Sequence, residues 1–167
     1  MKLNLGCGDK KKEGYINIDT CGMPDMCYDL STFPWPFEDS SADEIFSSHF
    51  LEHVLDYERT ILEIHRILKP DGIIHFHVPH FRNPLAVWHL HKWSFSTGTC
   101  ERLCEKLNYQ WEGRQLFRKE KMRMSFVTIG TPIARPLGWL ANIWPLCWDW
   151  LGFPTDEIEF VGRKVSD

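Results

Sequence analysis

The sequence has 167 residues and a formal net charge of -4. Its length predicts one domain that can bury a hydrophobic core without disulfides or metals. The negative charge gives no general attraction to phosphate backbones, so we expect no nucleic-acid partner. The N-terminus shows a strand pattern without the charged, apolar and small-residue succession of a signal peptide, and we therefore expect a cytoplasmic protein.

Short apolar runs alternate with loops in the first part of the chain. Residues 2–5 and 15–18 are bounded by Gly and Asp, and at that length they predict buried strands. The connector between them is too short for a crossover helix. A loop rich in Pro, Ser and Asp follows, with a short strand ending near "YDL", and residues 43–47 predict the next buried strand.

Helical and strand patterns alternate in the rest of the chain. Apolar residues from Leu51 to Leu68 recur at helical spacing, and "KPDG" predicts the end of that helix. "GIIHFHVP" predicts a strand, and Ser96 or Thr97 is expected to cap a helix through "TGTCERLCEKLN". We expect two more strands in "QLFRKEKMRMSFVTIG" and "EIEFVGRKV". This order predicts an α/β fold with a three-layer sheet.

A glycine turn, Gly6-Cys7-Gly8, follows the first strand. In dinucleotide-binding folds such a turn opens a helix whose N–H groups hold a pyrophosphate. Here no helix fits and the third glycine is absent, so a pyrophosphate would lose its usual place. Glycines still let the backbone pass close to a ligand without a phosphate. A tight turn with no ligand is the alternative.

Two acidic residues favour a binding site at this edge of the sheet. Asp19 ends the second strand, where a carboxylate can accept hydrogen bonds from both hydroxyls of a ribose. Asp29 ends the next apolar stretch and could receive an exocyclic amine such as that of adenine. Either residue alone would be interpreted as a solvated loop acid. Together with Gly6 and Gly8 they predict an adenosine pocket.

Several motifs carry a family resemblance in order and spacing. They are "LNLGCG", "NID", "YDL", "PFEDSSADEIFSSHFLEHV", "EIHRILKPDGIIHFHVP" and "EIEFVGRKV". This set, which spans most of the chain, resembles the class I S-adenosylmethionine-dependent methyltransferases of the broad type 11 group. The resemblance implies a Rossmann-like sheet, mostly parallel and ending in an antiparallel strand, and methyl transfer from S-adenosylmethionine. The sequence would be a short form that lacks the first crossover helix.

The resemblance also implies roles for residues at the first two strands. Gly6, Cys7 and Gly8 would pass under the methionine part of S-adenosylmethionine, and Asp19 would hold its ribose. The acidic residue that the family usually has shortly before the glycine turn is missing here, because the chain begins at Met1.

The remaining cofactor contacts would come from the next two strands. Asp29 and Leu30 would lie at the adenine edge. Ser47, Ser48 and His49, at the end of the strand over residues 43–47, would border the sulfonium and face the acceptor. No other cofactor is implied.

Histidines cluster in the middle of the sequence. His75 and His77 would point to the same face of their strand, and we interpret them as hydrogen-bonded structural residues. A pair of histidines with a third ligand would suit zinc, but no third ligand stands at a diagnostic spacing, so we predict no metal site. His80 and His91 lie where an acceptor is expected, and we hypothesise that one of them is a general base or an acceptor ligand.

A Trp/Pro-rich insertion at about residues 131–155 precedes the last strand of the single domain. It is largely apolar, but prolines, Arg135 and Asp149 interrupt it, so a straight membrane span is excluded. It could cover the sheet face that lacks the first helix, which is our leading interpretation. It could also wall an apolar or lipid-linked acceptor, or form a membrane-surface contact or a homodimer interface.

The acceptor implied by the resemblance is a small or lipid-linked molecule. Short relatives of this layout are associated with glycan synthesis, which makes a sugar hydroxyl the first candidate. The protein would then be cytoplasmic or peripheral to the inner face of the membrane. The alternative is a non-catalytic, methyltransferase-like binding or assembly module, and a nicotinamide-dependent oxidoreductase is disfavoured by the absent phosphate site.

Overall fold

A computed structural model describes residues 1–106, 113–125, 139–140, 142–144, 149 and 155–166. The strands are β1 (Lys2–Leu5), β2 (Ile16–Asp19), β3 (Met26–Cys27), β4 (Ala42–Ser48), β5 (Leu68–Pro79), β6 (Phe117–Ser125) and β7 (Glu157–Lys164). The helices are α1 (Tyr57–Ile67) and α2 (Thr97–Glu101), with short 3-10 turns at Pro84–Val87 and Arg102–Cys104.

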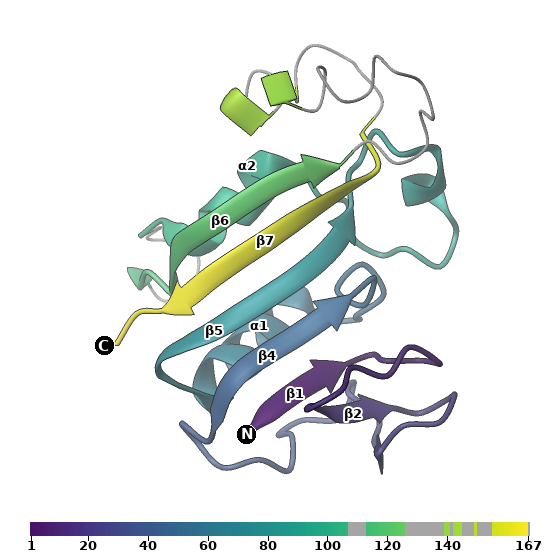
Figure 1. The fold of residues 1–167 in the computed structure, drawn as a ribbon, viewed down its shortest axis with the longest axis vertical. Coiled ribbons are helices and arrows are strands. Elements are labelled where there is room, and N and C mark those ends of the chain that lie inside the picture. Colours follow the sequence, from purple (N-terminus) through teal and green to yellow (C-terminus); the bar gives the residue numbers. More distant parts are fainter. Residues whose placement is uncertain (107–112, 126–138, 141, 145–148, 150–154, 167) are drawn as a thin grey trace.

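The strands form one seven-stranded sheet in the order β3-β2-β1-β4-β5-β7-β6 (Figure 1). The pairs from β3 through β5 are parallel, whereas β7 is antiparallel to both β5 and β6. The predicted Rossmann-like α/β sheet with an antiparallel C-terminal strand is therefore confirmed. Because β1, β2, β4 and β5 run in the same direction, their carboxyl ends meet at one edge of the sheet.

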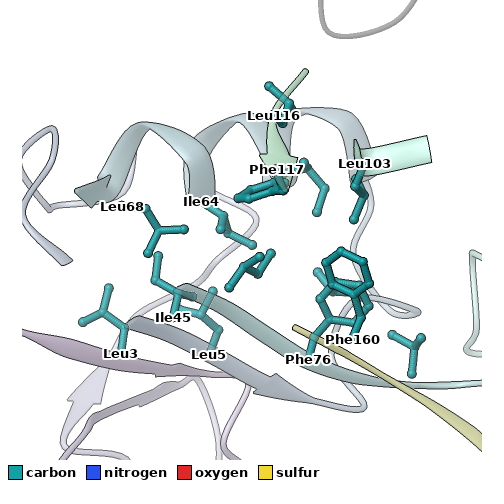
Figure 2. Packing of buried hydrophobic residues seen from close by; sticks show 14 of the residues in the cluster. Leu3, Leu5, Ile45, Ile64, Leu68, Phe76, Leu103, Leu116, Phe117 and Phe160 are labelled. Atoms are coloured by element: carbon teal, nitrogen blue, oxygen red, sulfur yellow. The ribbon is translucent and has the colours of Figure 1, made fainter. Parts of the chain in front are cut away.

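The hydrophobic core lies on one face of this sheet (Figure 2). Ile64 of α1 and Leu103 after α2 pack on strand residues such as Leu5 and Phe76. Both helices lie behind the sheet in Figure 1, so the described residues form two layers, with no helix seen on the other face. The third layer of the predicted three-layer arrangement is thus not found among the residues that the structure describes.

The first helix is shorter than the sequence pattern predicts. Asp56 is its N-cap, and its side chain accepts a hydrogen bond of 2.9 Å from the backbone N–H of Arg59. Residues 51–56 therefore form a loop, and the expected helix start at Leu51 is wrong. The apolar residues of this loop have helical spacing, but the side chain of Leu55 is 72% exposed and is not part of the hydrophobic core. An N-cap of this kind typically contributes about 1 kcal/mol to the helix.

Side-chain hydrogen bonds replace a helix in the link between β1 and β2. Asn17 is buried, and its Oδ1 accepts 2.7 Å hydrogen bonds from Asn4 Nδ2 and from the backbone N–H of Lys12. Its Nδ2 donates to Asp25 Oδ2 at 2.6 Å and to the Tyr15 carbonyl at 3.1 Å. Asn17 therefore satisfies backbone groups of this short link at Lys12 and Tyr15 that have no helical partner.

The sheet face opposite the helices is polar. On it, the ring of Phe46 contacts His75 with centroids 5.1 Å apart, and the ammonium group of Lys12 lies 4.0 Å from the Phe46 ring centre. Glu159 pairs with Lys121 at 2.8 Å and with His75 at 3.3 Å. A face of this composition does not require an apolar cover.

The Trp-rich insertion lies mostly outside the described residues. Asn142 bonds the backbone N–H and C=O of Met124 at the end of β6, at 2.8 and 3.1 Å. Trp139 and Trp144 are 67% and 65% exposed. The prediction that the insertion covers the sheet face, and the one that it forms an interface, remain predictions. No helix in the described part of the chain has the length and apolar character to cross a membrane.

We predict that Asn17→Ala lowers the free energy of unfolding by about 2–4 kcal/mol, because Asn4 and the N–H of Lys12 lose their buried acceptor. Urea denaturation followed by circular dichroism measures this difference. Glu13→Ala, at an exposed position in the same link, should change stability by less than about 0.5 kcal/mol. Equal effects of the two substitutions would contradict a structural role for the Asn17 network.

Candidate functional site

A cavity of about 510 Å³ lies at the carboxyl ends of the parallel strands. This is the edge toward which the arrowheads of β1, β4 and β5 point in Figure 1. A cavity of this size fits a ligand with the dimensions of a nucleoside derivative. Its lining residues are Gly6, Asp19, Thr20, Cys21, Tyr28, Asp29, Leu30, Ser31, Phe33, His49, Phe50, His53, Val54, Leu55, Asp56, Thr60, Trp88 and Leu90.

The glycine turn forms the floor of this cavity. Gly6 has a φ of +64°, and a Cβ at this position would lie 2.5 Å from the ring of Phe50. Gly22 has a φ of +76°, and a Cβ there would lie 2.4 Å from the Gly8 carbonyl oxygen. Only glycine fits such close approaches. The turn after β1 is therefore packed between the loop after β4 and the loop after β2.

Asp19 closes the turn. Its Oδ2 accepts a 2.8 Å hydrogen bond from the backbone N–H of Gly8, and its Oδ1 accepts from the N–H groups of Thr20 at 2.7 Å and Cys21 at 3.1 Å. Burial raises the pKa of Asp19, but these hydrogen bonds outweigh that effect and hold the pKa below its ordinary value. Asp19 is thus ionised at neutral pH, and its oxygens retain lone pairs for further donors.

Asp29 and Leu30 line the same end of the cavity, with Tyr28 and Phe33 beside them. Asp29 Oδ1 accepts a 2.9 Å hydrogen bond from the backbone N–H of Ser31, and this contact lowers the pKa of Asp29. This end of the cavity therefore combines two carboxylates with aromatic surface.

His49, which follows β4, faces the cavity from a strained backbone position with a φ of 54°. Its Nε2 lies 3.3 Å from Glu157 and its Nδ1 lies 3.2 Å from Glu52. Its contacts with Glu157 and then Glu52 raise the pKa of His49 to about 9. His49 is accordingly a cation at neutral pH and is not a proton acceptor there.

The other end of the cavity brings together residues that sequence analysis did not select. His53 and Val54, in the loop after β4, face Trp88 and Leu90, in the loop after β5. His91 lies directly behind them, with its ring centroid 4.8 Å from that of His53. Only the fold brings these two loops together, although "SSHFLEH" already showed a polar cluster after a buried strand.

His80 lies apart from this cavity and is fully buried. Its Nε2 donates to Asp149 Oδ1 at 2.9 Å, and its Nδ1 accepts from the backbone N–H of Arg82 at 3.2 Å. Burial lowers the pKa of His80, which keeps the ring neutral. Asp149 also accepts a 2.6 Å hydrogen bond from the hydroxyl of Thr97. Since both nitrogens are engaged, we assign His80 to anchoring Asp149 and do not place it in a catalytic step.

The other residues predicted at the cofactor lie near the cavity without lining it. Cys7 and Ser47 are buried, and Ser48 is partly exposed at the end of β4. Gly8 contributes through its bond to Asp19. Of the predicted cofactor set, the structure brings to the cavity wall Gly6, Asp19, Asp29, Leu30 and His49.

Comparisons with known proteins agree with this geometry. Residues 24–76 match the family model described as a methyltransferase domain. The sequence matches no curated protein at a significant level. The family match covers less than half of the chain, and together with the fold it supports a methyltransferase domain that uses S-adenosylmethionine.

Solved structures of this class share the fold at low sequence identity. An S-adenosylmethionine-dependent methyltransferase from Archaeoglobus fulgidus is 18% identical, with a TM-score of 0.61 over 98% of this chain and 85% of the other. One from Mesorhizobium loti is 17% identical, with a TM-score of 0.57 over 98% and 90%. Phosphoethanolamine N-methyltransferase 2 from Haemonchus contortus is 13% identical, with a TM-score of 0.61 over 99% of this chain and 48% of the other.

The residues at the cavity fit S-adenosylmethionine. S-adenosylmethionine carries no phosphate, and the turn at Gly6 brings backbone to the cavity without a helix behind it. Asp19 and Asp29 offer acceptors for hydroxyl and amine groups. The bound cofactor supplies an electrophilic methyl group on a sulfonium.

We predict that Gly6→Ala destabilises the protein through two separable effects. The positive φ alone costs about 1–2 kcal/mol for alanine, and contact with Phe50 adds about as much again. In a Phe50→Ala background the second contribution should shrink, because the ring is removed and only the 2.8 Å approach to the Cβ of residue 50 remains. A double-mutant cycle by chemical denaturation measures the coupling between the two sites. Strictly additive effects would show that Phe50 does not rest on the turn.

Proposed function

We propose that this methyltransferase binds S-adenosylmethionine along the cavity, with the adenosine at the Asp19 and Asp29 end, and methylates a hydroxyl of a small or lipid-linked acceptor. A sugar hydroxyl in glycan synthesis is the acceptor class that we favour. The observation that carries the proposal is the division of the cavity into an acidic end and an imidazole and indole end.

The acidic end suits a nucleoside. Asp19 would accept the hydroxyls of the ribose, because its carboxylate is ionised and already oriented by three backbone N–H groups. Asp29 and Leu30 would border the adenine, with Tyr28 and Phe33 supplying aromatic surface. The glycine turn would run beneath the rest of the cofactor.

The opposite end suits a hydroxyl on an apolar ring. His53 Nδ1 lies 3.3 Å from the Leu90 carbonyl, which only accepts hydrogen bonds, so Nδ1 carries the proton and Nε2 is left as an acceptor. Trp88 is 51% exposed beside it and offers a flat surface for a sugar ring. The chain would therefore orient the hydroxyl and exclude water around it, which is sufficient for much methyl transfer.

A lipid-linked form of the acceptor is supported by apolar side chains near the same edge of the sheet. Trp139, Ile143 and Trp144 are exposed, and the backbone of Met124, at the end of β6, is bonded to Asn142 from that segment. Clusters of exposed apolar residues are typical of surfaces that contact lipids or other proteins.

The nucleoside assignment predicts that Asp19→Asn weakens binding of S-adenosylhomocysteine by about 10- to 100-fold, because a charged acceptor contributes about 1.5–3 kcal/mol. Isothermal titration calorimetry measures the dissociation constants. Asp71→Asn is the matched control, since Asp71 lies at the opposite end of β5 and its φ of 60° is tolerated by asparagine. Unchanged affinity in a folded Asp19→Asn protein would show that the ribose is placed wrongly.

The acceptor assignment predicts an O-methylated product. The purified protein is incubated with ¹³C-methyl-labelled S-adenosylmethionine and a panel of methyl glycosides, nucleotide sugars, polyprenyl-linked saccharides, amines and thiols. Carbon chemical shifts separate methyl groups on oxygen, nitrogen and sulfur. We expect turnover only with hydroxyl acceptors. Methylation of an amine or thiol, with no product from any hydroxyl, would contradict the proposal while leaving methyl transfer itself intact.

A further inference from the structure

Three metal-ligating side chains meet beside the imidazole and indole end of the cavity. Potential ligand atoms of Glu52, His53 and His91 all lie within 4.8 Å of one another. Glu52 and His53 follow β4 and His91 follows β5, so two neighbouring parallel strands deliver them to the same edge. Tetrahedral ligands of a metal at about 2.1 Å lie about 3.4 Å apart, a distance that modest side-chain rotation reaches from here.

Both imidazoles are oriented as metal ligands usually are. His53 Nδ1 lies 3.3 Å from the Leu90 carbonyl and His91 Nδ1 lies 3.2 Å from the Ala86 carbonyl. A carbonyl oxygen cannot donate, so each Nδ1 carries the proton and each Nε2 presents its lone pair. Backbone carbonyls that hold Nδ1–H in this way are a common outer shell of histidine ligands, where they fix the tautomer and the ring orientation.

Glu52 supplies a buried carboxylate that lacks sufficient partners. Its side chain is 0% exposed, and among the described residues neither oxygen accepts a hydrogen bond. The imidazole of His49 lies 3.2 Å from its Oε1, but the same imidazole also lies 3.3 Å from Glu157. One imidazole ring thus lies between two carboxylates. Burying an under-compensated carboxylate costs several kcal/mol, and a divalent cation would offset that cost.

The two loops are tied together around these ligands. The Glu52 carbonyl accepts hydrogen bonds from the backbone N–H groups of Lys92 at 2.7 Å and Trp93 at 3.3 Å. Trp93 Nε1 donates to the Val54 carbonyl at 2.7 Å. The segments that carry Glu52 and His91 are therefore held in a fixed relation, as a metal site requires.

We propose that Glu52, His53 and His91 form a site for a divalent transition-metal cation, with zinc as the best match. Two histidines and one carboxylate are a ligand set typical of zinc and iron(II) centres that keep a coordination position open. Because His53 lines the cavity, an open position would face the cavity, and an acceptor oxygen bound to the metal there would replace the hydrogen bond to His53 Nε2 described above. This use of the site depends on the proposed function, but the binding of the cation does not.

The site was not predicted from the sequence because its ligands come from two separate loops. A second group, His75, His77 and Glu159, lies on the open sheet face, also within 4.8 Å of one another. There Glu159 is already paired with Lys121 at 2.8 Å and His77 with Glu157 at 3.3 Å. The charge of the Glu159 carboxylate is thus already balanced by Lys121, which favours the group at Glu52 as the metal site.

The test is metal binding by the full chain after treatment with a chelator and dialysis. Zinc is titrated against a chromophoric competitor, and cobalt(II) is added separately to record its d–d absorption. We expect one zinc per chain and an intense, tetrahedral-type cobalt spectrum. Glu52→Gln and His91→Gln should each weaken zinc binding by at least about 100-fold, because loss of an outer partner alone costs 10- to 100-fold. His89→Gln, an exposed residue of the same loop, is the matched control.

The outcomes separate the proposals. Absent zinc binding, a weak octahedral cobalt spectrum, or affinity unchanged in folded Glu52→Gln and His91→Gln proteins would overturn the metal site. Affinity lost instead in His75→Gln would assign the cation to the open sheet face and also overturn it. The cobalt spectrum of the unsubstituted protein stands even if a variant fails to fold. Methylation of hydroxyls that persists in chelator would leave the proposed function standing without the metal.

Discussion

The hydrogen bond from the Gly8 N–H to the Asp19 carboxylate is the contact on which the site depends. Adjacent parallel strands ordinarily need a crossover of a dozen or more residues between them, commonly a helix. Here β1 and β2 are joined by a turn, and the carboxylate of Asp19, at the end of β2, accepts a 2.8 Å hydrogen bond from the backbone N–H of Gly8 in that turn. The side chain of Asn17, in β2, stabilises the rest of the link by accepting hydrogen bonds from Asn4 Nδ2 and from the backbone N–H of Lys12. The same carboxylate that stabilises the turn therefore also lines the cavity.

The lack of a helix in this link also shapes the rest of the sheet. With α1 and α2 on one face (Figure 1), the core of the described residues lies on that face, and the other face carries the Lys121–Glu159 ion pair and the contact between the rings of Phe46 and His75. Functional groups then gather at the carboxyl edge, where the loops after β4 and β5 meet. This edge is the usual place for ligands in open α/β sheets. It holds both the cavity and the cluster of Glu52, His53 and His91.

Much of the fold could be predicted because each buried strand is recognisable in the sequence as a short run of apolar residues. The start of α1 could not be predicted. Val54 and Leu55 fit the helical spacing of apolar residues, but Asp56 is the N-cap and the helix begins only after it. Hydrophobic spacing alone could not weigh that cap. Asp19, Asp29 and His49 could be predicted at the cavity because each lies at the end of a parallel strand or shortly after it.

The other end of the site depends on contacts between distant segments. His80 was a candidate for a catalytic role because it directly follows β5. In the structure its Nε2 is hydrogen-bonded to Asp149, a residue of the insertion, and no local sequence pattern indicates this contact. His53 and Trp88 were overlooked because their loops meet only in the folded chain. The local sequence pattern therefore located Asp19 and Asp29 at the cavity, whereas His53 and Trp88 could be placed there only from the tertiary structure.

The most direct measurement is a crystal structure of the protein with S-adenosylhomocysteine. The account predicts ribose hydroxyls on the Asp19 carboxylate, adenine beside Asp29 and Leu30, and the sulfur facing the end of the cavity lined by His49 and His53. The Gly8 to Asp19 hydrogen bond should persist in that complex. Ligand density away from Asp19, or a turn that must open and break this hydrogen bond to admit the ligand, would contradict it.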